Sequence, residues 1–534
     1  MIVISLLGAI GGMAPRSMAS GNLGDVGIVG PSSAGVRTNP HALAPAVVGN
    51  SPRVYDTPHA SFAGVSSQQP SVSTQPALVS PALATSVTGT ATPFTGSDMM
   101  ASCSPSYCYK KPDGAVAAGP ASVLQAVNQA FAVYDRGGNE LLGPVSLQAF
   151  FDTSGHPYDE RAVYDAGNAV NRGYGGGSGR FILSALVQNS AGTSDILLAV
   201  SQNSSPESTA TLWCTYSFDG TVQFPSGKGA ADFDGLSTDG SNLYVSSNED
   251  TFNGATFLGS RILMIPKIGV YPDATTGACP TASTTSFSSV LNPDGSHAYA
   301  VQPANRPDAA HGTTYPMYFV NSIRTSGSSL SVRSIVKNSS GTPLLTPPRW
   351  ISVAAYSEPY SAPQPGGKNI YPGDASLLGA IYRYGQIYTA NSTRKVSGVT
   401  GANTYSSVQW YIFSPAQSTA ATYYYTDPVT SYYTPQVVVG CQTTAGACSA
   451  PYAALEVTGS SSTQAASAYW LVAGQGTPVL FQQGVPGWQY SAAWGDYPGV
   501  SVDPSNRTQV WLEGEYAETP TTWGTAMSSI CVAC

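Results

Sequence analysis

The stretch between Arg161 and Phe218 decides the fold class of this chain, because short apolar runs follow one another there with turn residues between them. The runs are RAVYD (161–165), RFILSALVQ (180–188), DILLAVSQ (195–202) and LWCTYSF (212–218). Runs of this length that are rich in Val, Ile, Phe and Tyr and bounded by Gly, Asn, Ser and Pro are typical of β-strands. Many short strands at roughly ten-residue spacing indicate a sandwich, a barrel or a propeller.

Comparable units recur along the rest of the chain, which favours the propeller. Each unit opens with a short strand, turns through Gly, Asn or Asp, and returns through an aromatic-rich strand. The units begin near Val123, Glu160, Asp232, Asp308, Leu377, Tyr452 and Trp494. At roughly sixty residues each they are somewhat longer than a four-stranded propeller blade needs. We therefore predict an all-β fold, a β-propeller with seven blades, and keep six blades as the alternative because the spacing is uneven.

The composition agrees with a β-rich surface protein. Only 10% of residues are charged, against about 25% in typical soluble domains, while Gly (56), Pro (40) and Tyr (31) are abundant. The net charge of -8 arises from few charges of either sign, so no basic face exists to bind nucleic acid. Sparse ionisable groups should make stability less dependent on pH, and an acidic extracellular habitat is a hypothesis that follows.

The chain divides by composition into three segments. Residues 1–18 contain the apolar run IVISLLGAI and are predicted to be a residual signal-like segment, too short to span a bilayer. Residues 19–118 are a low-complexity arm or linker of Ala, Ser, Pro and Thr. This arm could lie along the main domain or on a neighbouring subunit. Residues 119–534 are predicted to form the propeller, and nothing in them is apolar for long enough to be a membrane helix.

The even number of cysteines indicates disulfides and hence a secreted or cell-surface location. Three pairs are close in sequence, and two cysteines remain as a fourth bridge. The predicted pairs are Cys103 with Cys108, Cys441 with Cys448, Cys531 with Cys534, and Cys214 with Cys279. Zinc is the competing interpretation of CSPSYC and CVAC, but zinc sites usually add a second Cys pair or His, and no His lies near either motif.

A resemblance supports the propeller prediction. The segments NQAFAVYDRGGNELLGPVSLQAFF, ADFDGLSTDGSNLYVSSNE, GSRILMIPK, WGDYPGVSVDP, VWLEGEYA and WGTAM, together with the runs quoted above, resemble a family of secreted bacterial and archaeal β-propeller proteins. That family is mostly uncharacterised and is distantly similar to sialidase and BNR-type propellers. The similarity covers roughly Gly119 to the C-terminus and implies a fold more than an activity. No arginine triad or clean Asp-box matches the sialidase pattern.

Candidate ligand-binding residues are the polar side chains expected at the mouth of the central channel. Inner strands of a propeller face that channel, so polar residues that open them converge there. The candidates are Asp159, Glu160, Asp232, Asp234, Asp308, His311, Asp496, Tyr497, Glu513 and Glu515. Such converging carboxylates could recruit calcium, the one cofactor that this pattern suggests. Asp232, Asp234 and Asp496 could instead cap backbone turns.

The hairpin WGDYPGVSVDPSNRTQVWLEGEYA (494–517) can be interpreted either as part of a site or as a structural element. Glu513 and Glu515 are two apart in a strand and share a face. They could serve as a glycosidase acid and base, or form a solvated edge or a calcium site. We interpret the hairpin as a blade's inner hairpin, with its Trp packed between blades.

These features lead to one leading functional hypothesis and one alternative. The leading hypothesis is a secreted or cell-surface binding or assembly module that contacts a glycan or a surface protein, for which the tyrosines of YYYTDPVTSYY (423–433) offer stacking faces. The arm could dock on a neighbouring copy and build a homo-oligomer or fibre. The alternative is a glycan-active hydrolase or lyase with carboxylates at the channel mouth.

Overall fold

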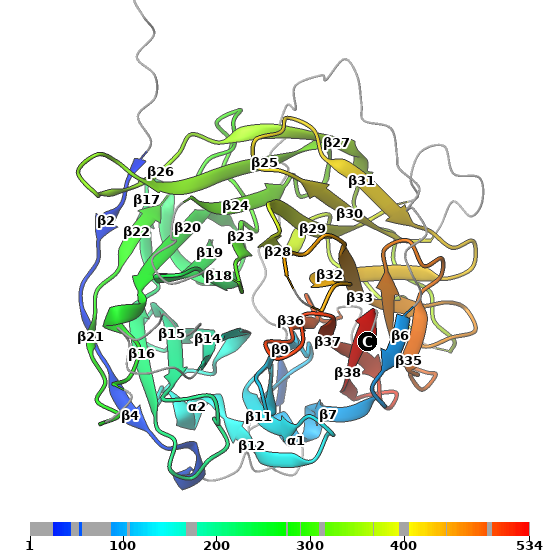
Figure 1. The fold of residues 1–534 in the computed structure, drawn as a ribbon, viewed down its shortest axis with the longest axis horizontal. Coiled ribbons are helices and arrows are strands. Elements are labelled where there is room, and N and C mark those ends of the chain that lie inside the picture. Colours follow the sequence, from blue (N-terminus) through cyan, green and yellow to red (C-terminus); the bar gives the residue numbers. More distant parts are fainter. Residues whose placement is uncertain are drawn as a thin grey trace, which may run out of the picture.

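The computed structural model of the chain shows a nearly all-β molecule whose sheets are arranged in a ring (Figure 1). Two α-helices are described, each of four residues: α1 (Met99–Ser102) and α2 (Leu147–Phe150). The described residues are 25–43, 53–55, 87–103, 107–166, 179–273, 276–288, 290–308, 316–366, 368–394, 405–444, 446–488 and 494–532.

The ring consists of antiparallel sheets in which consecutive strands run from the centre to the outside, which is the arrangement of a β-propeller (Figure 1). Two neighbouring blades are joined at the centre because β23 and β28 pair in parallel. In chain order, the first blades contain β9 (Ala115–Ala118), β10 (Ser122–Val127), β11 (Ala130–Asp135) and β12 (Glu140–Ser146), and then β13 (Tyr158–Asp165), β14 (Arg180–Asn189), β15 (Thr193–Ser201) and β16 (Trp213–Asp219). The next blades contain β18 (Gly227–Thr238), β19 (Asn242–Thr251), β20 (Phe257–Pro266) and β22 (Thr285–Ser288), with β17 (Val222–Phe224) beside β18, and then β23 (Gln302–Asn305), β24 (Met317–Ser322), β25 (Ser326–Lys337) and β26 (Pro343–Leu345), with β27 (Arg349–Ser357) beside β25. The remaining blades contain β28 (Leu377–Arg383), β29 (Gln386–Thr393), β30 (Ser407–Phe413) and β31 (Ala421–Tyr425); β32 (Ser431–Cys441), β33 (Pro451–Ser460), β34 (Ser467–Val472) and β35 (Val479–Gln482); and β36 (Gly499–Val502), β37 (Gln509–Ala517) and β38 (Trp523–Val532).

The ring is closed by residues from both ends of the chain. The C-terminal region contributes only three strands to the last blade, namely β36, β37 and β38. Its outer strand is provided by β6 (Val87–Thr90) and β7 (Phe94–Asp98), which both pair with β38. Because this blade is built from two distant segments, the closure of the ring depends on long-range pairing. The predicted inner hairpin of 494–517 is confirmed as β36 and β37, which are antiparallel.

Residues 25–43 run along the outer edges of three successive blades, at the left of Figure 1, and we call them the belt. In the belt, β1 (Asp25–Val26) pairs with β26, β2 (Ile28–Val29) with β22, and β4 (Val36–Thr38) with β16. A further strand, β3 (Ser33–Ala34), pairs with β21 (Thr281–Ala282). The belt therefore covers outer strand edges that would otherwise present unpaired backbone groups.

Four inner strands share a β-bulge. The register shifts between Tyr158 and Arg161, between Asp232 and Gly235, between Leu377 and Ala380, and between Tyr433 and Gln436. The first extra residue has a positive φ in several blades: 52° at Asp159, 47° at Phe233 and 49° at Thr434. Asp113 and Ala300, just before β9 and β23, have φ of 47° and 50°. This left-handed conformation is costly for non-glycine residues, and it turns these side chains toward the centre of the ring.

Three of the four predicted disulfides are present in the described residues. They join Cys103 to Cys108, Cys214 to Cys279 and Cys441 to Cys448. The second of these links β16 to the segment that precedes β21. Cys534 lies outside the described residues, so the pairing of Cys531 with Cys534 stays a prediction.

Candidate functional site

Side chains from the inner-strand bulges fill the centre of the ring. Phe233, Ala300, Leu378 and Tyr497 come from four different blades and form one apolar cluster, which we call the central layer. The rings of Phe233 and Tyr497 meet edge to face with centroids 5.8 Å apart. All four side chains are buried. Phe233 and Leu378 of the central layer line one cavity at the centre of the ring, and Leu378 also lines a second one.

Arg161 supports the central layer from one side. Its guanidinium carbon lies 3.1 Å from the centre of the Tyr497 ring, a close cation–π contact. Nε donates to the backbone oxygen of Asp234 at 3.0 Å, and Nη1 donates to that of Leu378 at 3.4 Å. Burial raises the pKa of Asp234 to about 7, although Arg161 and the hydroxyl of Ser184 oppose the shift. These bonds tie three inner strands together.

A lysine and three carboxylates lie on the other side of the layer. Asp113, Asp159 and Asp496 bring one carboxylate oxygen each within 4.8 Å of one another. The ammonium group of Lys111 donates to both oxygens of Asp496 at 2.9 Å. Burial lowers the pKa of Lys111, but the charges of Asp496 and Asp113 outweigh it, and the pKa is raised. Lys111 is thus held as a cation among these acids.

The same carboxylates also hold backbone groups of neighbouring blades. Asp159 accepts from the amide of Phe233 at 2.8 Å, and Asp113 accepts from the amide of Asp496 at 2.6 Å. Asn128 donates to Asp113 at 2.7 Å and accepts from the amide of Asp159 at 3.1 Å. Buried polar groups normally require such partners. The carboxylates at the centre therefore bind backbone groups of the next blade and hold neighbouring blades together.

A cavity of about 320 Å³ opens above this arrangement, and we call it the entry cavity. Its floor includes Phe233 and Leu378 of the central layer. Aromatic side chains of Tyr299, Tyr371 and Trp494 line it as well. The volume lies at the lower end of the range for small-molecule sites, which is about 300–1,000 Å³. The entry cavity is large enough for one small ring.

Two ion pairs face each other across the entry cavity. Lys111 and Asp496 precede the inner strands β9 and β36, whereas Arg324 and Asp374 come from the blades of β24 and β28. Nε of Arg324 donates to Asp374 at 2.6 Å, and Asp374 also accepts from the amide of Ser376 at 2.7 Å. The Arg324 guanidinium lies 4.8 Å from the Tyr299 ring centre.

Tyr371 marks the rim of the entry cavity. It is 47% exposed and is therefore the most accessible aromatic of the lining. Burial of its inner part and the charge of Asp374 raise its pKa to about 12, so the hydroxyl stays protonated at neutral pH. An exposed ring above a lined cavity is suited to stacking on a flat ligand.

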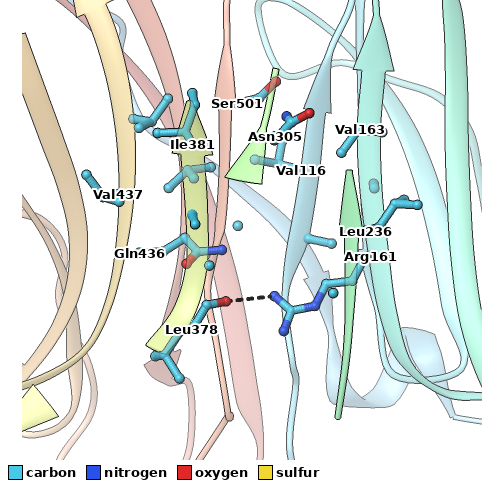
Figure 2. A pocket seen from close by; sticks show the side chains of 18 of the residues that line it. Val116, Arg161, Val163, Leu236, Asn305, Leu378, Ile381, Gln436, Val437 and Ser501 are labelled. Carbon is cyan, nitrogen blue, oxygen red and sulfur yellow. Dashed lines mark hydrogen bonds between the residues drawn. The ribbon is translucent and has the colours of Figure 1, made fainter. Parts of the chain in front are cut away.

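The space below the central layer is narrower and has a different lining (Figure 2). It holds about 90 Å³. Its lining combines apolar side chains with polar ones: Val116, Val163, Leu236, Asn305, Gln436 and Ser501. Figure 2 also shows the bond from Arg161 to the backbone oxygen of Leu378 at one end of this space. We call this space the lower channel. Its volume is below that of typical ligand sites.

Glu513 and Glu515 lie between blades rather than in either cavity. Both are buried. Glu513 accepts from the amide of Gly499 at 2.7 Å and from Gln125 at 3.2 Å, and burial raises its pKa to about 7. Glu515 accepts from the amide of Gly114 at 3.3 Å, and burial raises its pKa well above the usual range. Glu456 of the neighbouring blade is also buried, with a pKa raised by burial and by these two glutamates.

The predicted site residues are thus distributed over several environments. Asp159, Asp496 and Tyr497 lie at the central layer, and Glu160, Asp232 and Asp234 are buried beside it. Asp308 is exposed at the far end of the channel, where it accepts from Arg383 at 2.9 Å. His311 lies outside the described residues. A ligand-binding role for any of these residues stays a prediction.

Several residues of the entry cavity could not be identified as site residues from the sequence. Lys111, Asp374 and Tyr371 lie in loops before inner strands. Arg324 lies in the loop between β24 and β25, and no spacing or motif distinguishes any of the four. Asp113 could have been included, because it precedes an inner strand in the same way as Asp159.

Comparisons with known proteins give only remote similarity. No protein-family model and no curated protein sequence matches the chain. Solved structures that match include a Trypanosoma rangeli sialidase in complex with the inhibitor DANA, at 11% identity and a TM-score of 0.32, covering 66% of this chain and 53% of that one. A Xanthomonas citri GH43_1 enzyme matches at 11% identity and a TM-score of 0.29, covering 58% of this chain and 91% of the other. A Dyadobacter fermentans protein of unknown function matches at 9% identity and a TM-score of 0.32, covering 84% of this chain and 98% of the other. The chain spans about half the length of the sialidase, and no activity is transferred from these proteins.

Proposed function

We propose that the chain is a secreted or cell-surface propeller of seven blades that binds a small ligand in the entry cavity. The observation that carries this proposal is the cavity itself, which combines a suitable volume, aromatic walls and paired charges at the mouth of the channel. Ligand sites are commonly concave, largely apolar, and equipped with a few converging polar groups.

The geometry favours binding over glycoside hydrolysis. A glycosidase needs a carboxylic acid that keeps its proton beside the substrate, together with a second carboxylate. The carboxyls of Glu513 and Glu515, whose pKa burial raises, lie between blades and do not line the entry cavity. The two carboxylates that do line it, Asp374 and Asp496, are each bound to a cation. A hydrolase or lyase therefore remains the alternative function.

An extracellular location is supported by the cysteines. Three disulfides join described residues, and disulfides persist mainly in oxidising compartments. No helix of the described residues is long and apolar enough to cross a membrane. Membership of a secreted propeller family and assembly through the arm stay proposals. The belt is docked on its own chain here, and no observation favours a neighbouring copy over it.

The proposal can be tested by removing one wall of the entry cavity without disturbing the core. Tyr371→Ala deletes the exposed rim aromatic. A matched control is Tyr424→Ala on β31, which replaces a partly exposed tyrosine that does not line the cavity. We expect ligands found by NMR-detected fragment screening or on a glycan array to bind Tyr371→Ala about tenfold more weakly, and Tyr424→Ala unchanged.

The outcome that would overturn the proposal is binding that depends on Tyr424 and is indifferent to Tyr371, or a folded protein that binds nothing in either screen. Incubation of the same glycans with the wild-type protein, followed by analysis for cleavage products, separates the two functions. Released sugar would favour the hydrolase.

A further inference from the structure

The entry cavity has a balanced set of charges, which limits the ligands it can accept. Its charged lining residues are two cations, Lys111 and Arg324, and two anions, Asp374 and Asp496. Each cation is bound to one anion at 2.9 Å or less. The formal charge of the lining is therefore zero, and no cation there is without a partner carboxylate.

An acidic ligand is disfavoured by this arrangement. A ligand carboxylate that approached Arg324 would have to compete with Asp374, which lies 2.6 Å from the guanidinium and is fixed by the amide of Ser376. On the opposite wall, Asp113 and Asp159 lie close behind Asp496 and add negative charge. Like charges at such distances are costly when they are partly removed from water.

A cationic ligand is attracted by Asp113 and Asp159, but Lys111 already lies among these carboxylates and opposes a second positive charge. Such a ligand would approach the ammonium group of Lys111 and the guanidinium of Arg324, because each carboxylate of the lining already holds one of them. A bound cation could displace neither without leaving a desolvated positive charge unpaired. Lys111 is 3% exposed, so it cannot turn into solvent without rearranging its surroundings.

A neutral ligand with hydroxyl groups meets none of these penalties. An ion pair offers carboxylate acceptors and N–H donors side by side, and a hydroxyl group can donate to one and accept from the other. The exposed ring of Tyr371 would contact the C–H face of a ligand ring, as aromatic side chains with flat apolar surfaces do. The volume of about 320 Å³ suits one such ring.

We propose that the entry cavity recognises an uncharged, hydroxyl-bearing ring, namely a neutral glycosyl unit, and rejects acidic sugars. This inference rests on the proposed function of the entry cavity and specifies its ligand class. A site built from arginines without partner carboxylates would instead prefer acidic sugars over neutral ones.

The test is a glycan array that presents neutral hexose and N-acetylhexosamine glycans beside their sialylated, uronic and sulfated relatives. We expect the wild-type protein to bind neutral glycans at least about tenfold more strongly than acidic ones, with little change in affinity between about 0.05 and 0.5 M NaCl, since screening acts on charge–charge attraction. Asp374→Asn leaves Arg324 without its anion and should raise the relative signal for acidic glycans at least about fivefold.

Failure of the inference and failure of the proposed function give different results. Wild-type binding to acidic glycans, or to amine-bearing fragments, that is lost in Tyr371→Ala would overturn the neutral-ring inference and leave the cavity as a binding site. A wild-type protein that melts cooperatively but binds no glycan and no fragment would overturn both. If Asp374→Asn unfolds, Arg324→Gln provides the second variant, and its relative binding of acidic glycans should decrease further.

Discussion

At the scale of single residues, Lys111 is the group on which the acidic centre of the ring depends. Its ammonium group supplies positive charge where Asp113, Asp159 and Asp496 converge. Calcium would be an alternative source of that charge. Because a lysine already occupies the position, we expect the native protein to need no metal there.

We predict that Lys111→Met destabilises the protein by about 3–5 kcal/mol, because it leaves partly buried carboxylates without their cation. Added calcium should raise the melting temperature of this variant, while neither calcium nor EDTA changes that of the wild type. Differential scanning calorimetry measures both effects. Lys337→Met, at the exposed end of β25, is the matched control and should melt as the wild type does. A wild-type protein that loses stability in EDTA would show instead that a metal binds natively.

The buried glutamates predict how stability depends on pH. Burial raises the pKa of Glu513 from 4.5 to about 7, and it raises the pKa of Glu456 and Glu515 well above the usual value. The folded state thus keeps protons that the unfolded chain releases near pH 4.5. Their stabilising contribution is complete below about pH 4.5 and is lost as the pH rises through about 7 and beyond.

We therefore expect urea unfolding to show the greatest stability in mild acid and a decline toward pH 8. Glu513→Gln should remove on the order of 3 kcal/mol of that decline, since a pKa difference of one unit corresponds to about 1.4 kcal/mol. Glu358→Gln replaces a partly buried loop residue and is the control. It should show the same decline in unfolding free energy toward pH 8 as the wild type. Parallel pH profiles for the wild type and Glu513→Gln would contradict the account.

Residue roles could be predicted from the sequence only where a local pattern marks them. Two disulfides follow from short cysteine spacings, and the bridge from Cys214 to Cys279 follows as the pair that remains from an even count. The burial of Glu513 and Glu515 between blades does not follow, because a strand with both of its faces covered gives no alternating pattern. The weak pH dependence expected from the small number of charged groups stays a prediction. Burial of Glu456 and Glu513 opposes it, because burial raises the pKa of both groups.

At the scale of elements, the belt shows why certain glycines stand in a segment of low complexity. A Cβ atom at Gly27 would lie 2.2 Å from Cγ2 of Thr285, and one at Gly35 would lie 2.7 Å from Cβ of Cys279. The neighbouring side chain of Ile28 is 70% exposed. Close approach of the belt backbone to the blades therefore requires glycine at these two positions.

We predict that Gly27→Val releases the belt from β22, because the branched side chain cannot be accommodated. Hydrogen exchange followed by mass spectrometry should show loss of protection in residues 25–38, with the blades unchanged. Ile28→Ala is the matched control and should keep the protection of the wild type. Equal protection in Gly27→Val would mean that the belt does not pack as described.

Strands could be predicted from the sequence more readily than bulges. Strand positions follow from apolar runs between turn residues, and the runs from Arg161 to Phe218 correspond to β13, β14, β15 and β16. The repeated bulge could not be predicted, because its first residue differs from blade to blade: Asp159, Phe233, Leu378 and Thr434 share no side-chain property. The bulge is fixed by bonds between neighbouring blades instead.

At the scale of the whole molecule, the ring explains the unusual composition. Blades pack face to face, so most of the large aromatic side chains are buried between them, including Trp213, Trp410, Trp511 and Trp523. Several of the few charged residues are buried where blades meet at the centre, among them Lys111, Arg161 and Asp159. The propeller class was predictable from strand spacing, but the entry cavity was not, because it is assembled from loops of blades that are distant in sequence.

The central claim is that this ring presents a binding cavity for a neutral sugar at one end of its channel. The most direct measurement is a crystal structure of the protein soaked with a neutral glycan that the array identifies. We predict density for one sugar ring against Tyr371 and beside the two ion pairs of the entry cavity. A ring bound in the lower channel or on the tyrosines of 423–433, with the entry cavity filled only by water, would contradict the account.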